Sequence, residues 1–162
     1  MVKSVRFVPQ NSLAGKARRL PDTTVDELCE RASRAVDAAK EPLFAKLEEE
    51  AGRLKSKFDA LLQRRGGSAA DIRSLNAIAF ELKGLGGMFD YPLVSSISGL
   101  IFKMTKPDVR ITKEVLNVIG LQVDAVTVAM RERRKGDGGD GGQALVASLT
   151  EAMEKVLAND SR

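Results

Sequence analysis

The 162-residue sequence contains no histidine and no tryptophan, and it has only one cysteine and one tyrosine. Without histidine, the chain has no imidazole to act as general base, metal ligand, nucleophile or phosphoryl carrier. The single cysteine, Cys29, cannot form an internal disulfide, so the sequence gives no support for an oxidising compartment. We predict that Cys29 is a buried, inert thiol and that the protein is not an enzyme.

Long apolar runs are also missing. No run of about 18 apolar residues occurs, and no apolar stretch of signal-peptide length follows Met1. These absences predict a cytoplasmic protein without a membrane partner.

The formal net charge is +4, from 26 basic and 22 acidic residues, and most of the excess lies in the first twenty residues. Residues 1–22 have no sustained hydrophobic period and are interrupted by Pro9, Gly15 and Pro21. A basic arm could attract nucleic acid or an anionic membrane, but its charges are not interleaved with aromatic stacking positions. We therefore predict a solvated arm over 1–22, a single helical domain over 23–162, and no nucleic-acid partner.

The spacing of apolar residues predicts a series of amphipathic helices and no β-sheet. Thr24 and Glu27 form a capping box that predicts a helix start. The apolar stripe of this helix is expected to continue past Pro42, which either kinks one long helix or begins a second. Its members are Val25, Leu28, Cys29, Ala32, Val36 and Ala39, followed by Leu43, Leu47, Ala51, Leu54, Phe58 and Leu61.

Three further helices are expected after a turn over 64–68. The first has the core stripe Ile72, Leu75, Ala79, Leu82 and Gly86. The second is capped by Asp90, carries Pro92 in its first turn, and turns Leu93, Ile97, Leu100, Ile101 and Met104 inward. Because the link between them is short, these two helices should pack antiparallel. After a connection over 105–110, the third is a long helix to residue 133 with the stripe Val115, Ile119, Val123, Val126 and Met130.

The long helix has a second apolar stripe, formed by Val118, Leu121, Ala125 and Val128. It is therefore expected to be either the central helix or part of a subunit contact, so a homodimer is possible. A loop over 136–142 leads into a last helix with Leu145, Leu149, Met153 and Val156 on one side.

Two segments have sequence features of ligand-binding sites, but their positions relative to the predicted helices indicate that they do not form such sites. The 136–142 loop contains G-x-G-x-x-G, yet it follows a helix, and Asp137 and Asp140 would repel phosphate without completing a calcium site. Glu48, Glu49 and Glu50 are consecutive on a helix, so they point to different faces and are expected to be solvated. We predict no cofactor and no metal.

The most informative segment is 76–87. At about 100° per residue, Phe80 lies about 120° from the centre of the core stripe, so it should be at least partly exposed. It shares its face with Arg73, Asn76, Lys83, Gly84 and Gly87, which we predict to be the partner-binding residues. Gly84 or Gly87 could simply end the helix, or both could remove side chains so that a partner comes close.

This segment resembles the histidine phosphotransfer (HPt) family, whose helix carries His-x-Leu-Lys-Gly followed by a glycine three residues later. Leu82, Lys83, Gly84 and Gly87 match, whereas Phe80 stands where the histidine belongs and Asp90 replaces a later glycine. Residues 89–93 and the stretch from 121 through 139 look like a subgroup of bacterial stand-alone HPt proteins. The resemblance covers roughly residues 25–158 and is most specific over 78–94.

The resemblance implies an all-α four-helix bundle of HPt type with an additional N-terminal helix or arm. In the family, the histidine receives a phosphoryl group from a receiver aspartate, the lysine helps to neutralise it, and the glycine leaves room for the receiver. Phe80 has no nucleophilic atom, so the expected function is a degenerate HPt protein that binds a response-regulator receiver domain or a histidine kinase without carrying phosphate. Two alternatives remain: a structural or oligomeric helical bundle, and a cryptic enzyme or phosphoacceptor, with Glu81 or Asp90 as the residue that would take the phosphoryl group.

Overall fold

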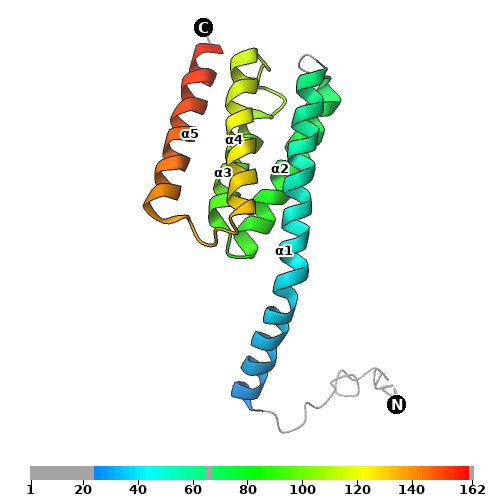
Figure 1. Ribbon diagram of the computed structural model, residues 1–162, viewed down its shortest axis with the longest axis vertical. Coiled ribbons are helices and arrows are strands. Elements are labelled where there is room, and N and C mark those ends of the chain that lie inside the picture. The colour runs from blue at the N-terminus through cyan, green and yellow to red at the C-terminus, as the bar shows by residue number, and fades with distance from the viewer. Residues whose placement is uncertain (1–23, 65–66, 161–162) are drawn as a thin grey trace, which may run out of the picture. The chain divides into compact units, whose positions relative to one another are not determined.

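The computed structural model describes residues 24–64 and 67–160 (Figure 1), so the arm predicted over 1–22 lies outside them. The described residues contain no strand, which confirms the all-helical prediction. They form five helices: α1 (Val25–Gln63), α2 (Ala69–Met88), α3 (Pro92–Met104), α4 (Lys113–Arg131) and α5 (Gly139–Asp160). None of the described helices is both long enough and apolar enough to cross a membrane. The chain divides into two compact units within α1, after Ala38.

The described part of the first unit is the beginning of α1. Its predicted capping box is confirmed, because Glu27 N–H donates to Thr24 Oγ1 at 3.3 Å and Thr24 N–H donates to Glu27 Oε2 at 3.0 Å. The predicted burial is wrong: Cys29 is exposed, and Val25 and Val36 are 75% and 60% exposed. Helical spacing identifies an apolar face, but it does not show whether another element covers that face. The helix continues through Pro42 without a break.

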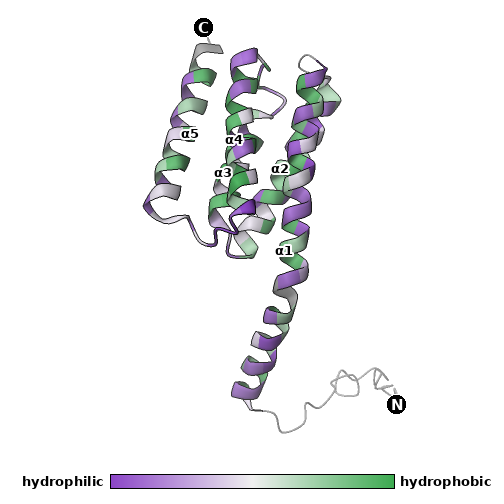
Figure 2. Ribbon diagram, in the orientation of Figure 1, coloured by the Kyte–Doolittle hydropathy of each residue, from purple (hydrophilic) through white to green (hydrophobic). Residues whose placement is uncertain are grey.

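The second unit has one hydrophobic core, to which α1 from Phe44 onward and the other four helices contribute. Leu47, Leu54, Leu75, Leu82 and Ile97 are among its fully buried side chains. The predicted inward stripes of α2, α3 and α4 are confirmed, except that Ile72 at the start of α2 is only half-buried. Figure 2 shows hydrophobic and hydrophilic segments alternating along these helices, as expected for amphipathic elements around a common core.

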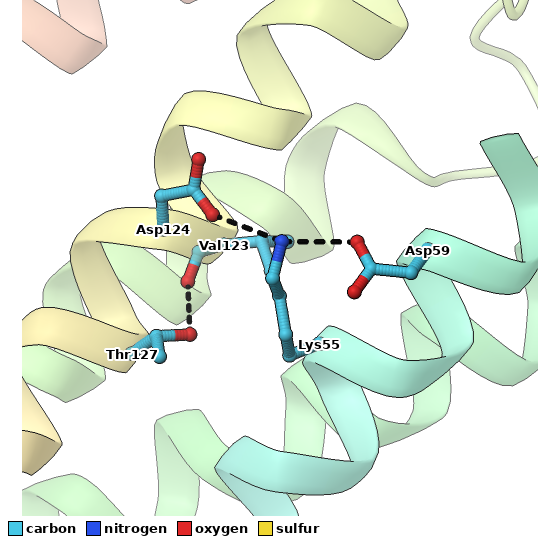
Figure 3. A network of polar contacts seen from close by, with 5 residues as sticks. All are labelled: Lys55, Asp59, Val123, Asp124 and Thr127. Atoms are coloured by element: carbon cyan, nitrogen blue, oxygen red, sulfur yellow. Dashed lines mark hydrogen bonds and ion pairs between the residues drawn. The ribbon is translucent and has the colours of Figure 1, made fainter.

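Helices α1 and α4 pack antiparallel. The Phe44 ring lies 4.5 Å from the Arg133 guanidinium, whereas farther along α1 the Phe58 ring lies against Gly120. Between these contacts, Lys55 Nζ is 2.9 Å from Asp59 Oδ1 and 3.2 Å from Asp124 Oδ1, which links the two helices (Figure 3). The hydrogen bond from Lys55 to Asp59 raises the pKa of this lysine most, and the hydrogen bond to Asp124 raises it further.

One acidic residue of α1 differs from the prediction. Glu48 and Glu49 are exposed as expected, but Glu50 is only 4% exposed. Its carboxylate accepts hydrogen bonds from Arg53 Nη1 at 2.6 and 2.7 Å. A buried carboxylate normally needs such a charged donor, and the sequence places this donor three residues away.

Helices α2 and α3 are antiparallel, as their short link predicts. Ser95 Oγ donates to the Lys83 carbonyl at 2.7 Å, whereas Asn76 near the other end of α2 donates to the Phe102 carbonyl at 3.0 Å. Gly86 is buried where the two backbones meet. A Cβ atom there would lie 2.8 Å from Ser95 N and 3.0 Å from the Tyr91 carbonyl oxygen, so only glycine fits this crossing.

The predicted cap at Asp90 is wrong. The N-cap of α3 is Tyr91, which makes no side-chain cap, and Pro92 occupies the first turn as expected. Asp90 instead adopts a left-handed backbone conformation with φ of 65°. Its carbonyl accepts a 2.9 Å hydrogen bond from Gly136 N–H, and the Gly136 carbonyl accepts one from Leu93 N–H at 3.3 Å. These bonds join the α2–α3 turn to the α4–α5 connection.

The loop predicted over 136–142 is shorter, because α5 already begins at Gly139. The Asp137 carboxylate accepts hydrogen bonds from Gly139 N–H and Gln143 Nε2, both at 2.9 Å, and so supports the first turn of α5. These bonds, led by that from Gln143, lower the pKa of Asp137. The start of α5 that was predicted from the glycines alone is therefore too late in the sequence.

The second stripe of α4 is only partly buried. Val118 is buried and Ala125 half-buried, but Leu121 is 59% exposed and Val128 is 39% exposed. Leu121 and Val128 are two helical turns apart on the same side of α4. This side of α4 is therefore open to solvent within the second unit.

Candidate docking face on α2 and α3

Helix α2 carries all the predicted partner-binding residues and begins at a well-defined cap. Ser68 Oγ accepts from Asp71 N–H at 3.2 Å, and the Asp71 carboxylate accepts from Ser68 N–H at 2.9 Å. The Asp71 carboxylate also accepts a hydrogen bond from Ser68 Oγ at 2.9 Å. The bond from the Ser68 backbone, and then the one from its hydroxyl, lower the pKa of Asp71. The cap fixes where α2 starts, and the buried stripe of the helix decides which residues face away from the core.

Phe80 is 60% exposed, as its position outside the core stripe predicts. Its ring centroid lies 5.5 Å from that of Phe102 on α3, with the rings tilted by 44°. Phe102 is half-buried and packs against the core. An aromatic pair of this geometry fixes the orientation of Phe80 while leaving most of its ring open.

Lys83 lies one turn beyond Phe80 and is held against α3. Its Nζ is 5.9 Å from the centroid of the Phe102 ring, which is within the range of a cation–π interaction. Its stem passes Gly99, where an added Cβ would lie 3.8 Å from Lys83 Cδ. Together with the hydrogen bond from Ser95 to the Lys83 carbonyl, these contacts position a cationic group beside the Phe102 ring.

Gly84 lies in the interior of α2, which continues to Met88, so it does not end the helix. A Cβ atom at Gly84 would meet nothing within 4 Å, whereas one at Gly87 would make ordinary contact with Ser95 Oγ at 3.5 Å. Gly87 lies in the last turn of α2, which continues to Met88, and it does not have the positive φ that favours glycine after the end of a helix. Packing therefore explains Gly86 but gives no reason for glycine at position 84.

Arg73 and Asn76 differ from each other in environment. Arg73 is exposed. Asn76 is half-buried, and its Nδ2 donates to the Phe102 carbonyl at 3.0 Å and to Thr105 Oγ1 at 2.9 Å. These bonds satisfy groups at the end of α3, so Asn76 holds α2 and α3 together and has less freedom to bind a partner than Arg73.

The structure brings α3 residues into this surface that the sequence reasoning missed: Ser95, Gly99 and Phe102. Phe102 could have been found, because it lies outside the inward stripe of α3 just as Phe80 lies outside that of α2. Ser95 and Gly99 carry no comparable sequence pattern. We define the α2–α3 face as Arg73, Phe80, Lys83, Gly84, Gly87, Ser95, Gly99 and Phe102.

The α2–α3 face is suited to binding, since it combines an exposed ring, a cation and positions without side chains. Across the residues that the structure describes, acidic and cysteine side chains do not gather in a group of three that could hold a metal ion. No family model, curated protein or solved structure matches the chain. The function is therefore inferred from the geometry and the side-chain chemistry of the α2–α3 face.

Proposed function

We propose that this chain is a cytoplasmic HPt-like protein that binds a response-regulator receiver domain or a histidine kinase through the α2–α3 face without carrying phosphate. The observation that carries the proposal is the presentation of Phe80, which is 60% exposed beside Gly84, a glycine that no packing contact requires. A large exposed ring next to positions without side chains is a typical interface anchor. The helical bundle and the Leu82-Lys83-Gly84 sequence agree with the resemblance to HPt domains.

The chemistry of the face supports binding over phosphoryl transfer. Phenylalanine at position 80 has no nucleophilic atom, and the sequence contains no histidine to replace it. Lys83 retains a positive charge that can meet the acidic site of a receiver. A protein of this kind would compete with phosphotransfer proteins for a receiver, or it would act as an adaptor or allosteric regulator.

The primary test measures the affinity of purified receiver domains and kinase domains from the source organism for the chain and for Phe80→Asp. A carboxylate in place of the anchor ring should weaken binding by roughly 100-fold, about 2.7 kcal/mol. Leu121→Asp is the matched control, since Leu121 is also about 60% exposed but lies on α4. Equal affinities of the chain and Phe80→Asp, or no binding to any of these domains, would contradict the proposal.

A second candidate function is homo-oligomerisation through α4, which the exposure of Leu121 and Val128 favours. The same two variants separate it from receiver binding. Sedimentation at several concentrations should then show an oligomer that Leu121→Asp dissociates and Phe80→Asp does not.

A further inference from the structure

Within the second unit, helix α1 runs antiparallel to α2. Arg64 Nη1 lies 3.7 Å from Asp71 Oδ1 near the start of α2. The hydrogen bond with Glu50 raises the pKa of Arg53 most, and the charge of Glu81 on α2 raises it further. Arg53 precedes Arg64 along α1, whereas Glu81 follows Asp71 along α2. The two helices therefore keep contact over several turns.

Four cations of α1 lie on the edge of the helix that faces α2. At about 100° per residue they fall within a sector of about 40°. We call them the cationic row: Lys46, Arg53, Lys57 and Arg64, all exposed. The pKa of Asp71, which the hydrogen bonds from Ser68 lower most, is lowered further by charges of this row, including that of Lys57. Glu50 and Asp71 each form an ion pair with one of the two arginines. Among the described residues no acidic side chain forms an ion pair with Lys46 or Lys57, so the row keeps positive charge for a partner.

Helix α2 carries an exposed apolar row on its outer side. Its members follow one another at intervals of three, four and four residues, and they are Ala77, Phe80, Gly84 and Met88. Phe80 is 60% exposed and Met88 is 74% exposed, and a rise of about 1.5 Å per residue separates them by about 12 Å along the helix. Gly84 lies between them, where an added Cβ would meet nothing within 4 Å. The row is therefore a depression between two large apolar side chains, which a side chain of a partner can fill.

Cations flank this apolar row on both sides. The cationic row of α1 lies on one side, and Lys83 lies on the other, beside Phe102 of α3. Arg73 lies closer to the start of α2 and is also exposed. Of the described residues that form α2, Glu81 is the only exposed acid, and the neighbouring charge of Arg53 offsets it. The surface is therefore apolar along its middle and positively charged along its edges.

We propose that the partner of this surface docks through an acidic amphipathic helix that lies along α2. The proposal rests on the proposed function, in that it takes the α2–α3 face as a docking site. Apolar side chains of the partner helix fill the depression at Gly84, and its carboxylates meet the cationic row on one side and Lys83 on the other. Met88 and the lysines of the cationic row then join the docking residues. Nucleic acid matches the surface less well, because stacked bases need a series of exposed rings and Phe80 is the only exposed ring here.

The first test uses two synthetic helical peptides that share one apolar row and carry either glutamates or lysines on both sides of it. At low salt the full chain should bind the acidic peptide roughly tenfold more tightly than the basic one, and added salt should reduce this difference. Lys57→Glu should weaken binding of the acidic peptide roughly tenfold. Lys113→Glu is the matched control, because Lys113 is also exposed but lies at the start of α4.

A second pair of variants tests the apolar contact. Met88→Ala should weaken binding of the acidic peptide roughly tenfold without loss of stability, because the Met88 side chain is largely exposed. Leu121→Ala is its control on α4, where Leu121 is 59% exposed. Equal effects within either pair of variants, equal affinity for the two peptides, or no binding of either peptide would overturn the inference. Tighter binding of a single-stranded oligonucleotide, or self-association that Lys57→Glu disrupts, would assign the surface to another occupant and also overturn it.

Receiver and kinase domains separate this inference from the proposed function. A domain whose affinity falls with Phe80→Asp but not with Lys57→Glu or Met88→Ala would support the proposed function and overturn the acidic helix. If the acidic peptide binds in a manner that depends on Lys57 and Met88, while no receiver or kinase domain binds, the partner class in the proposed function is wrong and the acidic helix is supported.

Discussion

The two sides of α2 use the same residue type for different purposes. On the side that meets α3, Gly86 is buried, and an added Cβ would lie within 3.0 Å of two backbone atoms. On the outer side, Gly84 has nothing within 4 Å of an added Cβ and lies beside the exposed Phe80. Glycine in a helix interior costs about 1 kcal/mol relative to alanine. The close approach of α3 accounts for this cost at Gly86, whereas nothing inside the described chain accounts for it at Gly84.

The largest expected effect tests the packed side. Gly86→Ala should lower the free energy of unfolding of the bundle by about 2–3 kcal/mol, because the new methyl group must push the backbones of α2 and α3 apart. Chemical denaturation measures this change. Gly87→Ala is the adjacent control, since its Cβ would make only an ordinary contact with Ser95 Oγ at 3.5 Å. Equal stability of the two variants would mean that the α2–α3 crossing is looser than described.

The next effect tests the boundary between the two sides, where Asn76 lies. Asn76→Ala should cost about 1–2 kcal/mol of stability, because the Phe102 carbonyl and Thr105 Oγ1 each lose a donor. Arg73→Ala is the control on the same helix, and its effect should stay within about 0.5 kcal/mol, as for other exposed positions. If receiver affinity fell with Asn76→Ala while stability did not, Asn76 would belong to the docking surface after all.

The smallest expected effect is a gain in stability, and it tests the outer side of α2. Gly84→Ala should raise the free energy of unfolding by about 0.5–1 kcal/mol, because alanine is the better helix former and meets no neighbour. The same change should weaken receiver binding if a partner approaches the helix at this point. Stability by denaturation and affinity by calorimetry therefore move in opposite directions. An affinity that stays constant would remove Gly84 from the proposed interface.

The sequence was sufficient to predict the helices of the bundle and their inner faces. Residues such as Leu75, Ile97 and Val123 follow the helical period closely, and burial depends mainly on that period once helices have neighbours. The exposure of Phe80 followed from the same geometry. The starts of helices were harder to predict. Helix α5 begins earlier than its glycines suggest, because the Asp137 carboxylate supports its first turn. Asp90 does not cap α3 with its side chain; its backbone carbonyl instead accepts a hydrogen bond from Gly136 in the α4–α5 connection.

Two kinds of information could not be read from the sequence. One is whether an apolar face is covered, which is why Cys29 and Val36 were expected to be buried and are exposed. The other is which residues on different helices meet, because side-chain spacing describes one helix at a time. Phe102 lies beside Phe80 because α2 and α3 pack antiparallel in one particular register. Contacts between the helices, such as that of Gly86 with Ser95, set this register.

The packing of Tyr91 also gives the molecule an internal optical reporter. It is the only tyrosine in a chain without tryptophan, it is 3% exposed, and its ring centroid lies 5.5 Å from that of Phe44. Burial raises the pKa of its phenol, so native and unfolded chains should ionise at different pH in a spectrophotometric titration. Because Tyr91 belongs to the core of the second unit and is the chain's only tyrosine, tyrosine fluorescence of the protein alone follows the folding of the bundle.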